Sequence, residues 1–159
     1  MGNNMIFSFL NNTQNKRCHE RYETNHYEHD DCGYANGYVA IPPSHPMHGK
    51  KYDDVPIDVH GGLTFSKPMD YVKNVFKDTE CLGFDSLDEI PNDYWVFGFD
   101  TMHLYDNYRD EDRDYCVKET MRMTDQLTGN GSISSNIKSR NLNVKHLVLN
   151  TINLLKDLA

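Results

Sequence analysis

The sequence predicts an α+β fold: a three- or four-stranded antiparallel sheet packed by one long helix, with a further helix at the C-terminus. Three observations favour this class. An aromatic and β-branched run, YWVFGF at 94–99, is typical of a short buried strand, and apolar residues recur at helical spacing over 112–127 and again over 142–159. With 159 residues, the chain is long enough for one domain with a substantial core.

Residues 1–35 are predicted to form a polar N-terminal segment. It contains a short apolar element, MIFSFL at 5–10, which an Asn-rich loop follows. The next stretch, Lys16–Asp31, is almost wholly polar, and its first half has helical propensity. We therefore expect this segment to precede the folded core.

The α+β core is expected to span 36–128. Its first strand, Tyr38–Ile41, ends at two prolines, which cannot donate to a sheet. The run IDVHGGLTF at 57–65 alternates apolar and polar residues, which predicts a strand; the Gly61–Gly62 pair is either a bulge or a place where another backbone comes close. We expect this strand to pair antiparallel with YWVFGF.

Helices and a linker complete the predicted domain. A short helix is expected near MDYVKNVF at 69–76, and a long one at 112–127, which the Gly129 turn ends. The stripe of the long helix is predicted to consist of Val117, Met121 (together with Thr120), Thr124 and Leu127. Residues 129–141 are expected to be a linker, and 142–159 the C-terminal helix.

Charge and composition exclude several classes of function. The net charge of -8 is wrong for direct binding of nucleic acid, which needs a cationic surface. No apolar run approaches the ~20 residues that cross a bilayer, and no basic leader suggests a signal peptide. We therefore expect a protein of the bacterial host cytoplasm, with no membrane partner. The cysteines are expected to be reduced thiols: Cys18, Cys32, Cys81 and Cys116.

One polar cluster points to metal or acid–base chemistry. Asp100, His103 and Asp106 recur at every third position after the YWVFGF strand, and His60 ends the neighbouring predicted strand. Two imidazoles and two carboxylates could hold zinc or manganese. The alternative is architectural: Asp100 caps the turn that leaves the strand, and His103 satisfies a buried carbonyl. No cofactor other than this divalent metal is expected.

A second histidine-rich stretch, 18–32, carries weaker signals. Its cysteines and histidines match no zinc-finger spacing, so solvated histidines are the favoured interpretation. The His60–Gly61–Gly62 turn offers backbone N–H groups that could bind an anion, although no P-loop lysine follows. No nucleophile motif stands out, and we assign no catalytic residue.

An acidic, tyrosine-rich run is the predicted binding surface. Tyrosines among carboxylates suit a partner rich in lysine and arginine, such as a nucleic-acid enzyme. The alternative is a solvated helix N-terminus, which carboxylates stabilise through the helix dipole. The predicted contact residues are Tyr105, Asp106, Tyr108, Asp110, Glu111, Asp112, Asp114 and Tyr115.

The blocks NGYVAIPPSHPMHGKKYDD, IDVHGGLTFS, WVFGFDTMHLYD and YCVKETMRMTDQL resemble a family of small phage- and prophage-encoded proteins. The resemblance covers Asn36 to Leu127. That family has no settled biochemical activity. In size and acidity the chain also resembles anti-CRISPR proteins from phages of low-GC Gram-positive hosts. This resemblance implies a counter-defence protein that binds a type II CRISPR effector nuclease and blocks DNA cleavage.

The leading prediction is therefore a non-catalytic inhibitor of a basic host protein. The first alternative is a metal-dependent hydrolase that acts on a nucleotide or a nucleotide signal, with His60, Asp100, His103 and Asp106 as ligands or acid–base residues. A further alternative is a protein that sequesters a small signalling molecule at the His-Gly-Gly turn.

Overall fold

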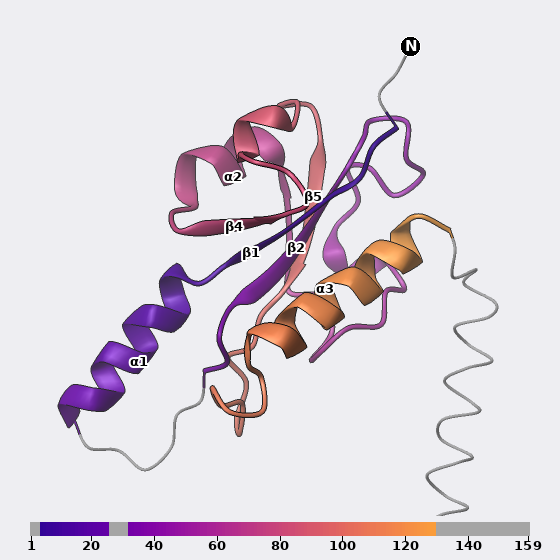
Figure 1. Cartoon of the computed structure of the whole chain (residues 1–159). Helices are drawn as coiled ribbons and strands as arrows, with labels where there is room; N and C mark the ends of the chain where they lie inside the picture. The colour runs from indigo at the N-terminus through magenta and orange to yellow at the C-terminus, as the bar shows by residue number, and fades with distance from the viewer. Residues whose placement is uncertain (1–3, 26–31, 130–159) are drawn as a thin grey trace, which may run out of the picture.

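A computed structural model describes residues 4–25 and 32–129, which form a five-stranded sheet with two helices packed on it and a third that extends beyond the end of the sheet (Figure 1). The strands are β1 (Phe7–Asn11), β2 (Asn36–Ile41), β3 (Phe65–Pro68), β4 (Thr79–Leu82) and β5 (Trp95–Phe99). The helices are α1 (Thr13–Asn25), α2 (Met69–Val75) and α3 (Arg113–Leu127), with single 3-10 turns at Tyr52–Asp54 and Leu87–Glu89. The predicted α+β class is confirmed.

The sheet has the strand order β3-β5-β2-β1-β4, and every neighbouring pair is antiparallel. It therefore has five strands where the sequence predicts three or four. The additional strands are β1 and β4. Every residue of β1 is buried, including the polar Ser8, whose hydroxyl lies 2.7 Å from the Thr124 hydroxyl on α3. Because β1 pairs with both β2 and β4, the predicted N-terminal segment 1–35 supplies an interior strand of the sheet.

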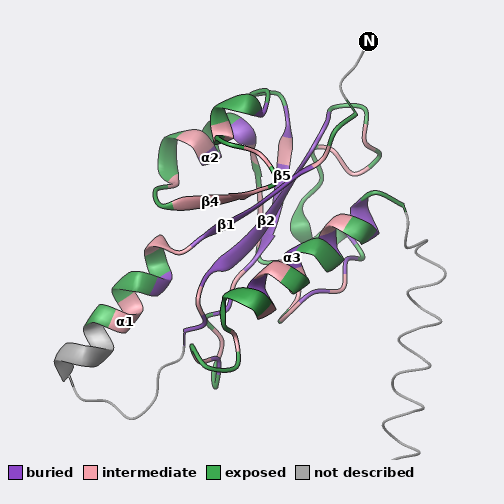
Figure 2. Ribbon diagram, viewed as in Figure 1, coloured by how far each residue is buried: buried purple, intermediate pink, exposed green. Residues whose placement is uncertain are grey.

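The central strands β1 and β2 are buried along their whole length (Figure 2). Two large hydrophobic cores lie on the two faces of the sheet. One core packs the strands against α2, and the other packs them against α3. The first contains Phe7, Phe9, Tyr38, Ala40, Met69, Val72, Ile90, Tyr94 and Val96. The second contains Val39, Ile41, Val55, Ile57, Val59, Phe97, Phe99, Met123 and Leu127.

The predicted helix at 112–127 is confirmed as α3, and Asp112 caps it by accepting a hydrogen bond from the Tyr115 N–H at 2.9 Å. Its buried face differs from the predicted stripe, because Met121 is 42% exposed. Gly37 in β2 explains the rotation: a Cβ there would overlap Thr120 and lie 2.6 Å from Phe99. The bare backbone of Gly37 lets the helix approach through the Thr120 face. The buried residues are Cys116, Thr120, Met123, Gln126 and Leu127.

The predicted strand at 57–65 is wrong over all but its last residue, because residues 57–64 form no strand and β3 begins at Phe65. Residues 57–60 form no strand and run beside α3, where the Gln126 amide bonds both backbone groups of Asp58 at 2.8 Å. A helix side chain thus replaces a strand partner, while Ile57 and Val59 still turn into the core. The predicted antiparallel pairing with β5 is confirmed for β3, Phe65–Pro68.

The predicted short helix at 69–76 is confirmed as α2. The predicted linker, beyond Gly129, and the predicted C-terminal helix at 142–159 lie outside the described residues. Within 4–25 and 32–129, no helix has the length and apolar character to span a bilayer.

Candidate functional site

A tight turn at residues 59–62 places His60 beside the loop that follows β5. The Gly62 N–H donates to the Val59 carbonyl at 2.9 Å, and both glycines have positive φ, 64° at Gly61 and 82° at Gly62. The glycine pair therefore forms a turn, and the prediction of a strand bulge is wrong. A Cβ on Gly61 would lie 2.5 Å from His103 Nε2, so glycine is needed for this turn to approach the loop after β5.

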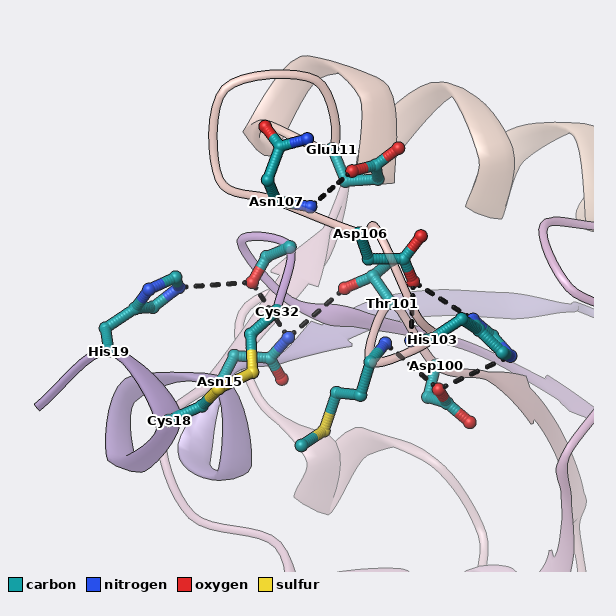
Figure 3. Close-up of a disulfide and its surroundings, with 12 residues drawn as sticks. Asn15, Cys18, His19, Cys32, Asp100, Thr101, His103, Asp106, Asn107 and Glu111 are labelled. Carbon is teal, nitrogen blue, oxygen red and sulfur yellow. Dashed lines mark hydrogen bonds and ion pairs between the residues drawn. A yellow bond between two sulfur atoms is a disulfide. The ribbon is translucent and has the colours of Figure 1, made fainter. Parts of the chain in front are cut away.

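Asp106 joins two histidines. His60 Nε2 lies 3.0 Å from each carboxylate oxygen of Asp106, and His103 Nδ1 lies 3.0 Å from Oδ2. The His103 backbone N–H also donates to Oδ2 at 2.8 Å, which closes the loop on itself (Figure 3). We call His60, His103 and Asp106 the His–Asp cluster.

Asp106 is buried, with 6% of its surface exposed. Burial alone acts to raise the pKa of this carboxyl, but hydrogen bonds from His60 and from the backbone and side chain of His103 outweigh it and hold the pKa below its ordinary value. Asp106 is therefore a carboxylate at neutral pH. It lies beneath the loop surface that the sequence assigned to partner contact.

Tyr115 holds the other nitrogen of His60. Its hydroxyl lies 2.7 Å from His60 Nδ1, so a residue on α3 fixes the orientation of the imidazole. Burial, with smaller contributions from Glu119 and Glu111, raises the pKa of Tyr115 to about 12. The phenol therefore keeps its proton at neutral pH. Tyr115 was predicted as a partner-contact residue, and no pattern in the sequence linked it to His60.

The predicted metal-binding set is brought together in part. His60, His103 and Asp106 each offer one ligand atom within 4.8 Å of the others. Asp100 stands beside the cluster: its Oδ1 lies 3.7 Å from His103 Nε2 and accepts a hydrogen bond from the Met102 N–H. The architectural role predicted for Asp100, the turn cap, is therefore present, while His103 bonds a carboxylate and not the predicted carbonyl.

The loop above the cluster exposes apolar side chains. Within 102–108 the exposed fractions are Met102 38%, Leu104 72%, Tyr105 78% and Tyr108 48%. We call residues 102–114 the acidic loop surface, since Asp110, Asp112 and Asp114 are also exposed. Glu111 and Tyr115 are half-buried. Tyr105 has a φ of 75°, a left-handed conformation that costs a non-glycine residue roughly 1–2 kcal/mol.

Backbone hydrogen bonds clamp both ends of this loop to the segment before β2. The Gly33 N–H donates to the Thr101 carbonyl, and the Tyr34 N–H donates to the Glu111 carbonyl, each at 2.7 Å. Inside the loop, the Asn107 N–H donates to Glu111 Oε2 at 2.7 Å (Figure 3). The exposed side chains therefore stand on a loop with a fixed backbone.

The segment before β2 is itself tied to α1 by a disulfide between Cys18 and Cys32 (Figure 3). The expectation of four reduced thiols is wrong for this pair, and Cys81 and Cys116 are free. Asn15 and His19 on α1 also bond the Gly33 carbonyl, at 2.9 and 3.3 Å. The polar segment therefore braces the acidic loop surface, a role that its cysteine spacing did not indicate.

Two cavities lie away from the His–Asp cluster. One of about 490 Å³ is lined at its centre by Ile6, His45 and Leu127. Another of about 300 Å³ lies between α2 and β4, beside Lys73 and Cys81. Neither is lined by a residue of the cluster or of the acidic loop surface.

The fold, the His–Asp cluster and the acidic loop surface define an α+β protein with two adjoining polar features. Comparison with protein-family models, with characterised proteins and with solved structures gives no match. The phage-family and anti-CRISPR resemblances of the sequence therefore stay predictions.

Proposed function

We propose that this chain is a non-catalytic binding protein that docks through the acidic loop surface onto a cationic face of a partner protein. The observation that carries the proposal is the exposure of Leu104 and Tyr105, 72% and 78%, at the tip of a loop fixed by hydrogen bonds. Large exposed apolar side chains rimmed by polar groups mark interaction sites.

The fixed backbone of the loop favours binding because little conformational entropy is lost on association. Tyr105 adds a second argument. Tyr105 has a φ of 75°, and 78% of its surface is exposed. Strain of this kind is stored at functional sites, where a surrounding structure holds it in place.

Charge selects the kind of partner. Residues 105–115 carry five carboxylates against two arginines, and Arg113 already bonds Glu80 through its Nε at 2.8 Å. With a net charge of -8, the chain is repelled by nucleic acid and attracted to proteins that bind nucleic acid. The proposed target is a type II CRISPR effector nuclease, whose cationic channel holds RNA and DNA. The proposed setting is the cytoplasm of a phage-infected bacterium, where thiols are kept reduced, so the proposal depends on the hydrogen bonds of the loop and not on the Cys18–Cys32 disulfide.

The hydrolase alternative has a specific observation in its favour, the three convergent ligand atoms of the His–Asp cluster. An enzyme also needs a concave site for its substrate, and the two cavities described above lie elsewhere. The binding proposal therefore takes precedence.

The test is a binding and cleavage assay with a purified type II effector and its guide RNA. We expect the full chain to bind the effector, to slow DNA cleavage and to bind more weakly as salt rises. Tyr105→Ala and Leu104→Ala should each weaken binding at least tenfold. Tyr71→Ala is the matched control, because Tyr71 is 42% exposed on α2, which packs on the opposite face of the sheet.

Two results would count against the proposal in different ways. If the chain neither binds the effector nor affects cleavage, the proposed target is wrong. If Tyr105→Ala and Tyr71→Ala weaken binding equally, the acidic loop surface is not the contact surface.

A further inference from the structure

The ligand atoms of the His–Asp cluster are spaced as the ligands of one metal ion are. Ligand atoms roughly 2.0–2.1 Å from a tetrahedral zinc ion lie about 3.3 Å from each other. Asp106 Oδ2 lies 3.0 Å from His60 Nε2 and 3.0 Å from His103 Nδ1. A small outward movement of these three groups would therefore admit an ion between them.

The outer contacts of the cluster orient each ligand. His60 bonds Tyr115 through Nδ1 at 2.7 Å, which leaves Nε2 facing the centre of the cluster. His103 presents Nδ1 to the centre, while its Nε2 faces Asp100 at 3.7 Å. Metal-bound histidines in proteins donate from their second nitrogen to a carboxylate, a carbonyl or water. The Tyr115 hydroxyl has this position at His60, whereas Asp100 lies 3.7 Å from His103 Nε2, an ion-pair distance longer than a hydrogen bond.

The chemistry of the ligands selects the class of ion. Two imidazoles with one carboxylate suit zinc and its first-row neighbours, whereas magnesium and calcium prefer oxygen ligands. We propose that His60, His103 and Asp106 bind one divalent transition-metal ion of the zinc type, with Asp100 and Tyr115 as the groups that orient the two histidines.

Three protein ligands leave a fourth position for water or for a group on a partner. The ion would also join the Gly61 turn to the loop after β5, because His60 belongs to the first and the other two ligands to the second. Metal binding would then stiffen the acidic loop surface. The metal site does not depend on the proposed function, and its test needs no partner protein.

The test is titration of the tag-free full chain with zinc(II) alone, followed by calorimetry, and with cobalt(II), followed by visible absorption. We expect one ion per chain, an intense d–d spectrum typical of four-coordinate cobalt, and no competition from excess magnesium. His60→Ala, His103→Ala and Asp106→Asn should each weaken zinc binding at least tenfold. Tyr115→Phe, which keeps all three ligands, should weaken it about tenfold by releasing His60.

Other histidines provide the controls. His48→Ala removes an imidazole that bonds the Asp93 carbonyl at 2.7 Å and is not part of the His–Asp cluster, and it should leave zinc affinity unchanged. The double change His26→Ala/His29→Ala should also leave it unchanged. Loss of binding in this double variant, with retention in His103→Ala, would place the ion elsewhere and overturn the proposal.

A measurement on the unaltered chain covers the case in which a variant fails to fold. One equivalent of zinc(II) should shift the imidazole nitrogen resonances of His60 and His103 in nuclear magnetic resonance spectra. If those two resonances do not change while zinc binds, or if zinc does not bind at all, the proposal is wrong.

Discussion

Substitution of the two adjacent glycines at the turn separates backbone strain from displacement of His103. Gly61 and Gly62 both have positive φ, so alanine at either position pays the same kind of left-handed strain, roughly 1–2 kcal/mol. Both changes also restrict the unfolded chain to a similar degree. They differ in one respect: a Cβ at Gly61 overlaps the His103 ring, whereas a Cβ at Gly62 has nothing within 4 Å.

The difference in stability between the two variants therefore measures the hydrogen bond between the His103 side chain and Asp106. A hydrogen bond to a charged group contributes about 1.5–3 kcal/mol. The His103 side chain is 36% exposed, so water replaces part of what is lost, and we take the lower end of that range. Gly61→Ala should accordingly be less stable than Gly62→Ala by about 1.5 kcal/mol, or roughly 3–6 °C in melting temperature.

The assay is urea unfolding of the full chain, followed by circular dichroism. A double-mutant cycle with His103→Ala completes it, because without the ring the two alanines should cost the same. Equal stability of Gly61→Ala and Gly62→Ala in the unaltered background would refute this reasoning. A difference that survives in the His103→Ala background would refute it as well.

Three further changes test other parts of the structure. Cys18→Ser should lower the free energy of unfolding by about 3 kcal/mol, the value expected for a closed loop of this length. Reductant should destabilise the unaltered chain but not the variant. Equal unfolding midpoints of the two proteins would contradict the role of the disulfide. Gly37→Ala should cost about 1–3 kcal/mol by overpacking against Thr120 on α3 and Phe99 on β5, and an unchanged melting temperature would count against the close approach of α3. The pKa of Tyr115 is raised to about 12 in the folded state, so its contribution to stability is complete below pH ~10 and is lost as pH rises toward 12. Absorbance at the tyrosinate band should show one tyrosine that ionises at this high pH, and Tyr115→Phe should lack that ionisation.

The sequence predicted elements where local chemistry and burial agree. β5 is rich in aromatic and β-branched residues, and β2 ends at a proline pair, so both strands were found. β1 was missed because it is short and its Phe7–Ser8–Phe9 alternation stops at Leu10, which is also buried. Residues 57–64 were misassigned because they alternate at their start without forming a strand. Their alternation is real, but it arises from packing on α3, with the Gln126 amide in place of a neighbouring strand.

The sequence predicted the part of the site whose residues lie close together in the chain. Asp100, His103 and Asp106 lie within one loop, so their proximity follows from the sequence. His60 was expected beside them at a strand end, and it arrives there through a glycine turn. The bond between His60 and Tyr115 joins residues 55 positions apart on a turn and a helix, and no local pattern encodes it. The Cys18–Cys32 disulfide is likewise a tertiary contact, set by how α1 lies against the segment before β2.

The His–Asp cluster and the acidic loop surface share one stretch of backbone, so neither can change alone. Leu104 and Tyr105 lie between His103 and Asp106 in the sequence, and the Asp106 N–H bonds the His103 carbonyl at 3.0 Å beneath them. A metal ion held by His103 and Asp106 fixes the two anchors of the exposed tip. By thermodynamic linkage, any factor by which metal strengthens partner binding at that tip is the factor by which the partner strengthens metal binding. The His–Asp cluster is in this sense part of the binding surface, even though Asp106 itself is buried.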